Sequence, residues 1–549
     1  MGGIKRKRYI LIFPLNLKGE SYGIRKTETS VESFGPDIFG SWGDHRFWVV
    51  DGSLGGANIA GPAAWLSWVI GAVAVLLIGL VYAELGGAMP RAGGIIRYPD
   101  YSHGPIVGYM MGFAALIAYS SVAGIEVEAV RQYAQQWWPG LGTASGNVTA
   151  LGWFVQLALL VIFFLINYWS VNVFGKFNSI ITAIKFIVPL LTIIILFSSF
   201  HGSNFSSHGF ATHGFTGIES AVSTGGIVFA FLGFRQAVDF AGEAKNPQRN
   251  VPLAIVLAII LGAALYVLLQ VVFIGAVPAS SLASGWDKLS FKAPFADLAT
   301  LLGVGWLATL LFIDGAISPS GTGNIYQSST ARVIFAWART GTFFKVFSKV
   351  ESKTGIPRPA MILAFILAVF WTGPFPIWSQ LVGVVSSATV MTYIIGPVSA
   401  AAFRRTAPDL HRPFRLGGMG VIAPIAFVVG ALIIYWTGWS IDSWLIGLQI
   451  IMFVVYLILK NVMPMDAVPF GQQLKSSWWL VIYFVAMFII SYIGDFGGKN
   501  LIPSPWDQIL VIVVSLIAYY WGKASALPQP VLLDKEETEE EFDGEMASL

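Results

Sequence analysis

Long apolar runs separated by short polar stretches constrain this sequence more than any other feature. From Pro62 almost to the C-terminus, runs of about 20 residues contain almost nothing but apolar side chains. Of the 549 residues, 11% are charged, whereas a soluble globular protein carries roughly 25% charged residues. A helix of about 20 apolar residues spans a bilayer with all of its backbone hydrogen bonds satisfied internally. The sequence therefore predicts an all-α polytopic membrane protein.

Thirteen apolar windows are visible, and we interpret each as one membrane-crossing helix. We expect an N-terminal segment over 1–61, a transmembrane domain over 62–523, and an acidic tail over 524–549 that is disordered and cytoplasmic. The predicted spans cover residues 62–84, 105–129, 151–170, 178–199, 219–241, 252–276, 302–326, 360–376, 379–402, 420–438, 441–460, 476–494 and 506–522.

The basic residues divide the loops into two alternating sets. One set is rich in lysine and arginine, whereas the other holds only Lys288, Lys292 and Lys499. The positive-inside rule makes the basic set cytoplasmic, which places the C-terminal tail inside and the start of span 62–84 outside. The basic run Lys5–Arg8 places the N-terminus inside as well, so a fourteenth span is required before the first visible one. The basic set comprises Arg91, Arg97, Lys176, Lys245, Arg249, Arg332, Arg339, Lys345, Lys349, Lys353, Arg358, Arg404, Arg405, Arg412, Arg415, Lys460 and Lys475.

The required extra span is not visible between Lys26 and Pro62, where the sequence is polar and rich in glycine. Shifting the reading frame by one nucleotide would turn both Trp42 and Trp48 into glycine. The neighbouring codons would then permit LTFLGAGATIGSGWLMA, an apolar segment broken by glycines. We therefore hypothesise that residues 27–60 are a frame-shifted first span. The alternative is a genuine soluble N-terminal segment.

Residues 219–252 begin as an apolar span, are interrupted by glycine and leave the bilayer through a polar loop. We expect the helix to break around Phe231–Phe234, which frees backbone N–H and C=O groups. Secondary transporters bind substrates at such half-helix ends. Alternatively, the glycines at 225, 226 and 233 merely allow close helix packing. The predicted substrate-binding residues are Phe229, Ala230, Phe231, Gly233 and Arg235.

Arg235 lies close to the predicted bilayer midplane, where an unpaired guanidinium is costly. One partner could be a carboxylate of the substrate, bound by two parallel hydrogen bonds. The other could be Asp239, one helical turn later, in a purely structural pair. The sequence leaves both alternatives open.

Two more charged residues lie inside predicted spans, and we assign both to proton coupling. Lys185 follows Lys176 by nine residues and so lies about 14 Å into its helix. A desolvated lysine can gain and lose a proton near neutral pH, unless its head group reaches the cytoplasmic edge. Asp314 precedes Ile317–Asn324, where proline and glycine are expected to disrupt the helix. The hydroxyls there either coordinate a cation or proton carrier, or bond to their own helix carbonyls. They belong to Ser318, Ser320 and Thr322.

The remaining polar residues carry weaker expectations. Glu128 and Arg131 are expected to form a surface or vestibule pair, with a role in an outer gate as the alternative. The histidines, His103 among them, are expected to be solvated in loops. Nucleotide-binding and zinc-protease motifs are absent from the sequence, and it holds no cysteine. We therefore expect neither enzymatic activity nor a cofactor or metal, and we expect an ion or substrate gradient to supply the energy.

Several segments resemble the amino acid–polyamine–organocation superfamily of permeases. They are LVYAELGGAMPRAGG (80–94), FAFLGFRQAVDFAGEAKNPQRNVPLAI (229–255) and STARVIFAWARTG (329–341). The similarity runs from about Gly61 to Gly522 and is closer to one branch, the bacterial aspartate–proton symporters. It implies a five-plus-five inverted-repeat bundle with extra C-terminal helices and a substrate site between broken first and sixth helices. Lys185 matches the position that replaces a sodium ion in this pattern. The glycine-rich first helix is absent in the present frame.

This resemblance implies a proton-coupled importer of acidic amino acids, most of all aspartate, that works by alternating access. Its partners would be the amino acid, the proton and the lipid bilayer of the cell membrane, and not nucleic acid. An exchanger of amino acids or polyamines on the same scaffold is one alternative. An inactive permease that lacks its first helix is another. The oligomeric state is left open.

Overall fold

The computed structural model describes residues 46–531, apart from residues 92, 144–146, 170–185, 240, 242–243, 245, 352–355, 374–377 and 461–467. Within these residues the chain is helical and contains no β-strand. The helices are α1 (Arg46–Ala60), α2 (Ala64–Ala88), α3 (Gly94–His103), α4 (Pro105–Ala134), α5 (Ala150–Trp169), an unlabelled helix (Phe186–Phe197), α7 (Gly214–Ser223), α8 (Phe234–Asp239), α9 (Pro247–Ala276), α10 (Pro294–Leu301), α11 (Gly305–Arg339), α12 (Arg358–Trp371), α13 (Trp378–Tyr393), α14 (Ile395–Thr406), α15 (Met419–Thr437), α16 (Trp439–Leu459), α17 (Phe470–Ile493) and α18 (Trp506–Ser525).

The apolar runs of the sequence fold as helices, as expected for segments that must satisfy their backbone groups internally. Each of the thirteen predicted spans overlaps a described helix or a pair of helices. In the described part of the chain, nine helices are long and apolar enough to cross a membrane. The helix Phe186–Phe197 and α12 are apolar but shorter. The protein is therefore a multi-pass membrane protein.

Long and short helices recur in the same order in two halves of the chain. In the first half, α2, α3, α4 and α5 have 25, 10, 30 and 20 residues. In the second half, α9, α10, α11 and α12 have 30, 8, 35 and 14 residues. The corresponding helices pack on each other, α2 along α9 and α4 along α11. This order agrees with a five-plus-five repeat, followed by additional helices at the C-terminal end.

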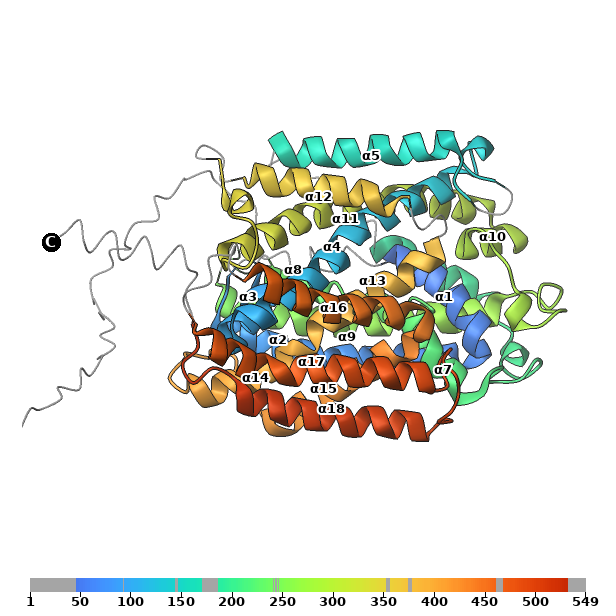
Figure 1. The fold of residues 1–549 in the computed structure, drawn as a ribbon. Helices are drawn as coiled ribbons and strands as arrows, with labels where there is room; N and C mark the ends of the chain where they lie inside the picture. The colour runs from blue at the N-terminus through green and yellow to red at the C-terminus, as the bar shows by residue number, and fades with distance from the viewer. Residues whose placement is uncertain are drawn as a thin grey trace, which may run out of the picture.

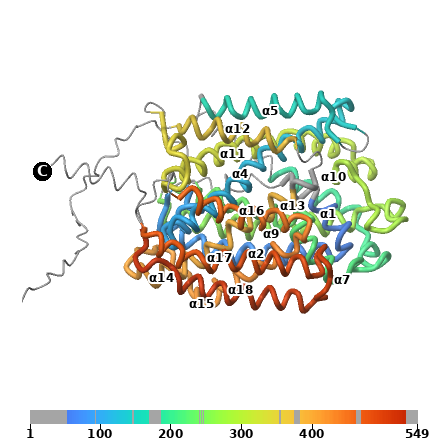
Figure 2. Tube along the Cα trace, in the orientation of Figure 1, coloured from blue at the N-terminus to red at the C-terminus, as the bar shows by residue number. Residues whose placement is uncertain are grey.

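The bundle has two outer edges and two ends. Figure 1 shows α5 and α12 along one edge and α15, α17 and α18 along the opposite one. The additional helices pack in sequence, because α17 contacts both α16 and α18. Helix α14 lies at one end of the bundle, whereas α1, α7 and α10 lie at the other end (Figure 2).

The helix α1 falls inside the segment 27–60, for which the sequence shows no span. It covers Arg46–Ala60 and is joined to α2 by a short 3-10 turn at Gly61–Ala63. The residues before Arg46 lie outside the described part of the chain. The 15 residues Arg46–Ala60, which belong to the N-terminal stretch that reads as polar and irregular, are therefore helical.

Two local expectations are wrong. Pro319 does not interrupt α11, which runs continuously from Gly305 to Arg339. Transmembrane helices tolerate proline because neighbouring side chains and helices satisfy the freed backbone groups. His103 is not solvated but fully buried at the end of α3. Its Nε2 lies 3.0 Å from the carbonyl oxygen of Gly522, because the last turn of α18 packs against this helix end.

Candidate functional site

The span that the sequence predicts to be broken is indeed broken, but over a longer stretch than expected. Helix α7 ends at Ser223 and α8 begins at Phe234. Between them, Gly226 has a φ of +80°, a left-handed conformation that glycine adopts at little cost. The break therefore begins about two helical turns before the predicted position at Phe231–Phe234.

Helix α1 lies directly against this break. An ideal Cβ atom on Gly55 would lie 3.2 Å from the carbonyl oxygen of Gly225, so a larger side chain would crowd the backbone there. Gln270 of α9 holds α1 in place by donating a hydrogen bond of 3.1 Å to the Ser53 carbonyl oxygen. The oxygen of the same Gln270 amide accepts a bond of 2.7 Å from the indole N–H of Trp68. Helix α1 and the α7–α8 break are therefore in direct contact.

The predicted binding residues gather on the second half of the break. Phe229, Ala230 and Phe231 form a 3-10 turn and are buried. The Phe231 ring lies 5.8 Å from the Trp68 ring and 5.3 Å from the Tyr266 ring, measured between centroids. This end of the break is therefore walled by aromatic side chains.

Arg235 is fully buried on α8, and its guanidinium lies between aromatic rings. The Cζ atom lies 3.8 Å from the centroid of the Tyr119 ring and 4.8 Å from that of Tyr326. Nη1 donates a hydrogen bond of 3.3 Å to the hydroxyl of Thr389 on α13. Nε and Nη2 have no hydrogen-bond partner among the described residues. Two parallel donors of a buried cation are thus available to an anionic ligand.

The structural pair between Arg235 and Asp239 is not formed. Asp239 is fully buried and accepts a short hydrogen bond from the hydroxyl of Tyr119. Its other oxygen, Oδ1, has no partner among the described residues, and neither amide atom of the buried Gln236 has one. Of the two alternatives that the sequence left open for Arg235, the ion pair with Asp239 is therefore excluded in this conformation.

Sequence reasoning missed Tyr119, Tyr326 and Thr389. Each lies inside an apolar span, where a tyrosine or threonine is indistinguishable from core packing until the helices are placed. In the sequence, the charge of Arg235 inside an apolar span was the observation that indicated the need for such partners. A buried cation needs rings or hydroxyls near it, but only the arrangement of α4, α8, α11 and α13 identifies which ones.

The residues predicted around Asp314 lie apart from Arg235. Asp314 is half-buried and precedes Tyr326 by twelve residues, which corresponds to about 18 Å along α11. Ser318 donates a hydrogen bond of 2.7 Å to the Asp314 carboxylate. Ser320 and Thr322 bond to carbonyl oxygens of their own helix, at 3.4 Å and 3.5 Å. These two hydroxyls thus follow the second alternative left open by the sequence. Lys185 lies outside the described residues.

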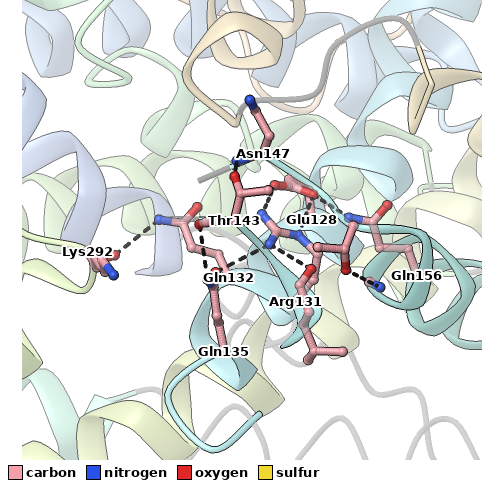
Figure 3. Close-up of polar contacts among 11 residues, drawn as sticks. Glu128, Arg131, Gln132, Gln135, Thr143, Asn147, Gln156 and Lys292 are labelled. Atoms are coloured by element: carbon pink, nitrogen blue, oxygen red, sulfur yellow. Dashed lines mark hydrogen bonds and ion pairs between the residues drawn. The ribbon is translucent and has the colours of Figure 1, made fainter. Parts of the chain in front are cut away.

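The pair between Glu128 and Arg131 forms, but it is buried and not at the surface. Figure 3 shows the Arg131 guanidinium against the Glu128 carboxylate, with Nε at 3.0 Å from Oε2. Gln156 of α5 donates to the same carboxylate, and Arg131 also reaches the carbonyl oxygen of Leu141 at 3.2 Å. The pair is buried because α5 and the turn at Pro139–Leu141 pack over it. It therefore ties α4 to α5.

Comparison with known proteins identifies the family. The model of the family described as amino acid permease matches residues 49–493. An aspartate-proton symporter of Bacillus subtilis (strain 168) is 50% identical over 480 residues, which cover 87% of this chain and 92% of the relative. The glutamate/serine transporter AimA of the same organism is 41% identical over 496 residues, which cover 88% and 92%. The branched-chain amino acid permease BcaP is 25% identical over 414 residues, which cover 73% and 87%. A family match over most of the transmembrane helices leads to one conclusion: the chain belongs to the amino acid permease family.

Proposed function

We propose that this protein is a proton-coupled symporter that imports acidic amino acids, with aspartate as its principal substrate, by alternating access. The observation that carries the proposal is the buried Arg235, whose Nε and Nη2 lack partners among the described residues. The relatives support the same substrate class. One is named an aspartate-proton symporter and another a glutamate/serine transporter. Their names do not favour an exchanger or an inactive permease.

The substrate is proposed to bind between the α7–α8 break and α4. The two unpaired donors of Arg235 suit the two oxygens of a side-chain carboxylate, because a guanidinium and a carboxylate match in a planar, two-bond geometry. The backbone of Phe229, Ala230, Phe231 and Gly233 would hold the ammonium and carboxylate of the amino-acid moiety, since a broken helix leaves backbone groups free.

The proton is proposed to be carried by Lys185, with Asp314 as a further protonatable group. Lys185 is assigned from the sequence, where a lysine falls deep in an apolar span. Asp314 is assigned from its place on α11, where the Ser318 hydroxyl bonds its carboxylate. Ser320 and Thr322 are proposed to solvate the proton or a cation there when α11 moves.

The protein is proposed to lie in the cell membrane with both termini in the cytoplasm. The arginines at the end of α14 and in the following loop, Arg404, Arg405, Arg412 and Arg415, support this orientation. Arg405 donates a hydrogen bond of 3.1 Å to the carbonyl oxygen of Ala524, in the last turn of α18. Basic loops stay on the cytoplasmic side of a membrane.

Uptake of labelled aspartate into proteoliposomes tests the proposal. We expect an imposed pH gradient, alkaline inside, to drive accumulation into vesicles that hold no amino acid. A protonophore is expected to abolish it. Uptake that needs preloaded amino acid, or that ignores the pH gradient, would contradict the symport mechanism. Equal uptake of aspartate and of a neutral amino acid of similar size would contradict the substrate class.

A further inference from the structure

A second buried carboxyl group lies outside the site around Arg235, on the additional C-terminal helices. Asp442, in the first turn of α16, is 0% exposed. Its Oδ1 accepts a hydrogen bond of 3.4 Å from Ser387 of α13, and its Oδ2 accepts one of 3.3 Å from Ser491 of α17. The ion pairs formed by the described residues do not include Asp442. Among the described residues, the carboxyl group of Asp442 therefore has two polar contacts, both of them long hydrogen bonds from neutral hydroxyls.

Asp507 provides a comparison, because it also lies in a first helical turn and its carboxylate accepts several hydrogen bonds from strong donors. It is also fully buried, in the first turn of α18. The Tyr435 hydroxyl lies 2.5 Å from it, and it accepts backbone N–H bonds from Asp495 and Gln508 at 3.2 Å and 2.7 Å. Asp442 receives no backbone N–H bond from the described residues. Without a cation or strong donors, a deprotonated carboxylate in such a buried position costs several kcal/mol.

Among the described residues, no cation forms an ion pair with Asp442. Helix α16 packs against α4, α13, α15 and α17. On α17, Tyr483 is the titratable side chain that interacts electrostatically with Asp442. The facing groups of the other helices are engaged elsewhere. Glu128 and Arg131 of α4 pair with each other, Tyr109 of α4 contacts Tyr456, Tyr393 of α13 bonds to Leu232, and Tyr435 of α15 bonds to Asp507.

Helix α13 connects Asp442 to Arg235. Ser387 contacts Asp442, and Thr389, two residues later, contacts Arg235. Two residues correspond to about 200° of rotation around a helix, so the two contacts lie on opposite faces of α13. Gly383 allows α13 to approach α16 closely, since an ideal Cβ there would lie 2.3 Å from Ile441 Cδ1. A shift of α13 would therefore change the surroundings of both side chains.

We propose that Asp442 is an additional proton-binding site, which takes up and releases a proton as α13 moves during the transport cycle. The proposal rests on the proposed proton-coupled symport. It assigns a transport role to the additional helices, because Asp442 and Ser491 belong to α16 and α17.

The variant Asp442→Asn tests this role, because asparagine resembles the protonated side chain but cannot release a proton. We expect it to exchange labelled aspartate at the wild-type rate when no gradient is imposed. With a gradient of one pH unit and zero membrane potential, accumulation is expected to fall about tenfold, because one proton fewer is coupled to each substrate. The infrared band of a protonated carboxyl group, measured on purified protein at neutral pH, is expected to weaken.

The matched control is Asp507→Asn, which also replaces a fully buried aspartate in a first helical turn. It is expected to lower thermal stability and to leave both accumulation and the infrared band unchanged. Wild-type accumulation by Asp442→Asn, or an infrared spectrum that Asp442→Asn does not alter, overturns the proposal. If the wild-type protein fails to accumulate aspartate at all, the symport fails. The infrared comparison then still decides whether Asp442 holds a proton.

A second variant covers the case in which Asp442→Asn does not insert into the membrane. Ser491→Ala removes one hydroxyl donor and leaves the carboxyl group in place. Because that donor favours the charged form, the external pH of half-maximal uptake is expected to rise. An unchanged pH profile of Ser491→Ala overturns the proposal.

Discussion

Arg235 joins two properties that seldom coexist inside a membrane protein, complete burial and unused hydrogen-bond donors. If its planar fork binds the substrate carboxylate, Arg235→Lys keeps the charge but loses the paired geometry. We expect the KM for aspartate to rise roughly 10- to 150-fold, which corresponds to about 1.5–3 kcal/mol for a hydrogen bond to a charged group. Concentration-dependent uptake in proteoliposomes measures this. Uptake of any neutral amino acid that the protein accepts should change less.

A matched control for Arg235 exists on α12. The guanidinium of Arg358 also lies over a tyrosine ring, 4.5 Å from the centroid of Tyr168, and it pairs with Glu351 at 2.8 Å. Arg358→Lys should leave the KM for aspartate unchanged. A similar rise in KM for both variants would show that a general loss of packing, and not carboxylate recognition, explains the effect.

His103, at the end of α3 and outside the membrane-spanning segments, makes stability depend on pH. Burial lowers the pKa of its imidazole from 6.5 to about 4, although the hydrogen bond to Gly522 opposes the shift. Below pH 6.5 the unfolded chain binds a proton that the native protein does not bind until about pH 4. The free energy of unfolding is therefore expected to fall as the pH drops through this window, by about 1.4 kcal/mol per pH unit. His103→Gln should remove this part of the pH dependence of the thermal midpoint in detergent. The exposed His213, replaced by glutamine, should not; equal pH slopes in wild type and His103→Gln would refute the assignment.

At the scale of elements, the α7–α8 break depends on one backbone conformation. Gly226 has a φ of +80°, and any L-residue there costs roughly 1–2 kcal/mol. We expect Gly226→Ala to lower the thermal midpoint and to reduce aspartate uptake, because the half-helices can no longer keep their relative position. Gly447→Ala in the interior of α16 is the control. Its added Cβ would meet only Phe488 at 3.7 Å, so this variant should be slightly more stable and fully active. Normal uptake by Gly226→Ala would contradict a functional role for the break.

Whole helices could be predicted from the sequence, whereas their interruptions could be predicted only in part. An apolar run is a local property, so all thirteen spans overlap described helices. Whether a glycine or proline breaks a span depends on neighbours that come from elsewhere in the chain. Gly226 breaks its helix at the point where α1 packs against Gly225. Pro319 leaves α11 continuous.

The residues of the site could likewise be predicted where the signal is local in the sequence, but not where it depends on the packing of distant helices. Arg235 could be singled out because a charge in an apolar span is conspicuous in one dimension. Tyr119, Tyr326 and Thr389 come from three other helices, and their role requires the packing of α4, α11 and α13 around α8. The burial of the Glu128–Arg131 pair was missed for the same reason, because α5 and its Gln156 cover it.

At the scale of the whole molecule, polar contacts tie the bundle together at both ends. At one end, the buried Glu84 of α2 accepts hydrogen bonds from Arg404 at 2.8 Å and from the Leu416 N–H at 2.7 Å. At the other end, Gln508 of α18 donates a bond of 2.7 Å to Glu219 of α7. Both contacts join a helix of the repeat to a segment that follows α13 in the chain. The segments that follow α13 therefore hold α2 and α7 in place and do more than lengthen the membrane domain.

The N-terminal helix decides whether the whole molecule can function. Helix α1 already packs against the break at Gly225, although the stretch 27–60 reads as out of frame. Resequencing the coding DNA across codons 25–62 is expected to reveal one missing or extra base. The corrected chain would gain a glycine-interrupted apolar span before α2, which gives fourteen crossings and places both termini on one side. We expect gradient-driven aspartate uptake from the corrected chain to exceed that from the present one, since half of the expected site depends on this helix. Confirmation of the present frame, together with full uptake, would instead show that α1 alone supplies the first half of the site.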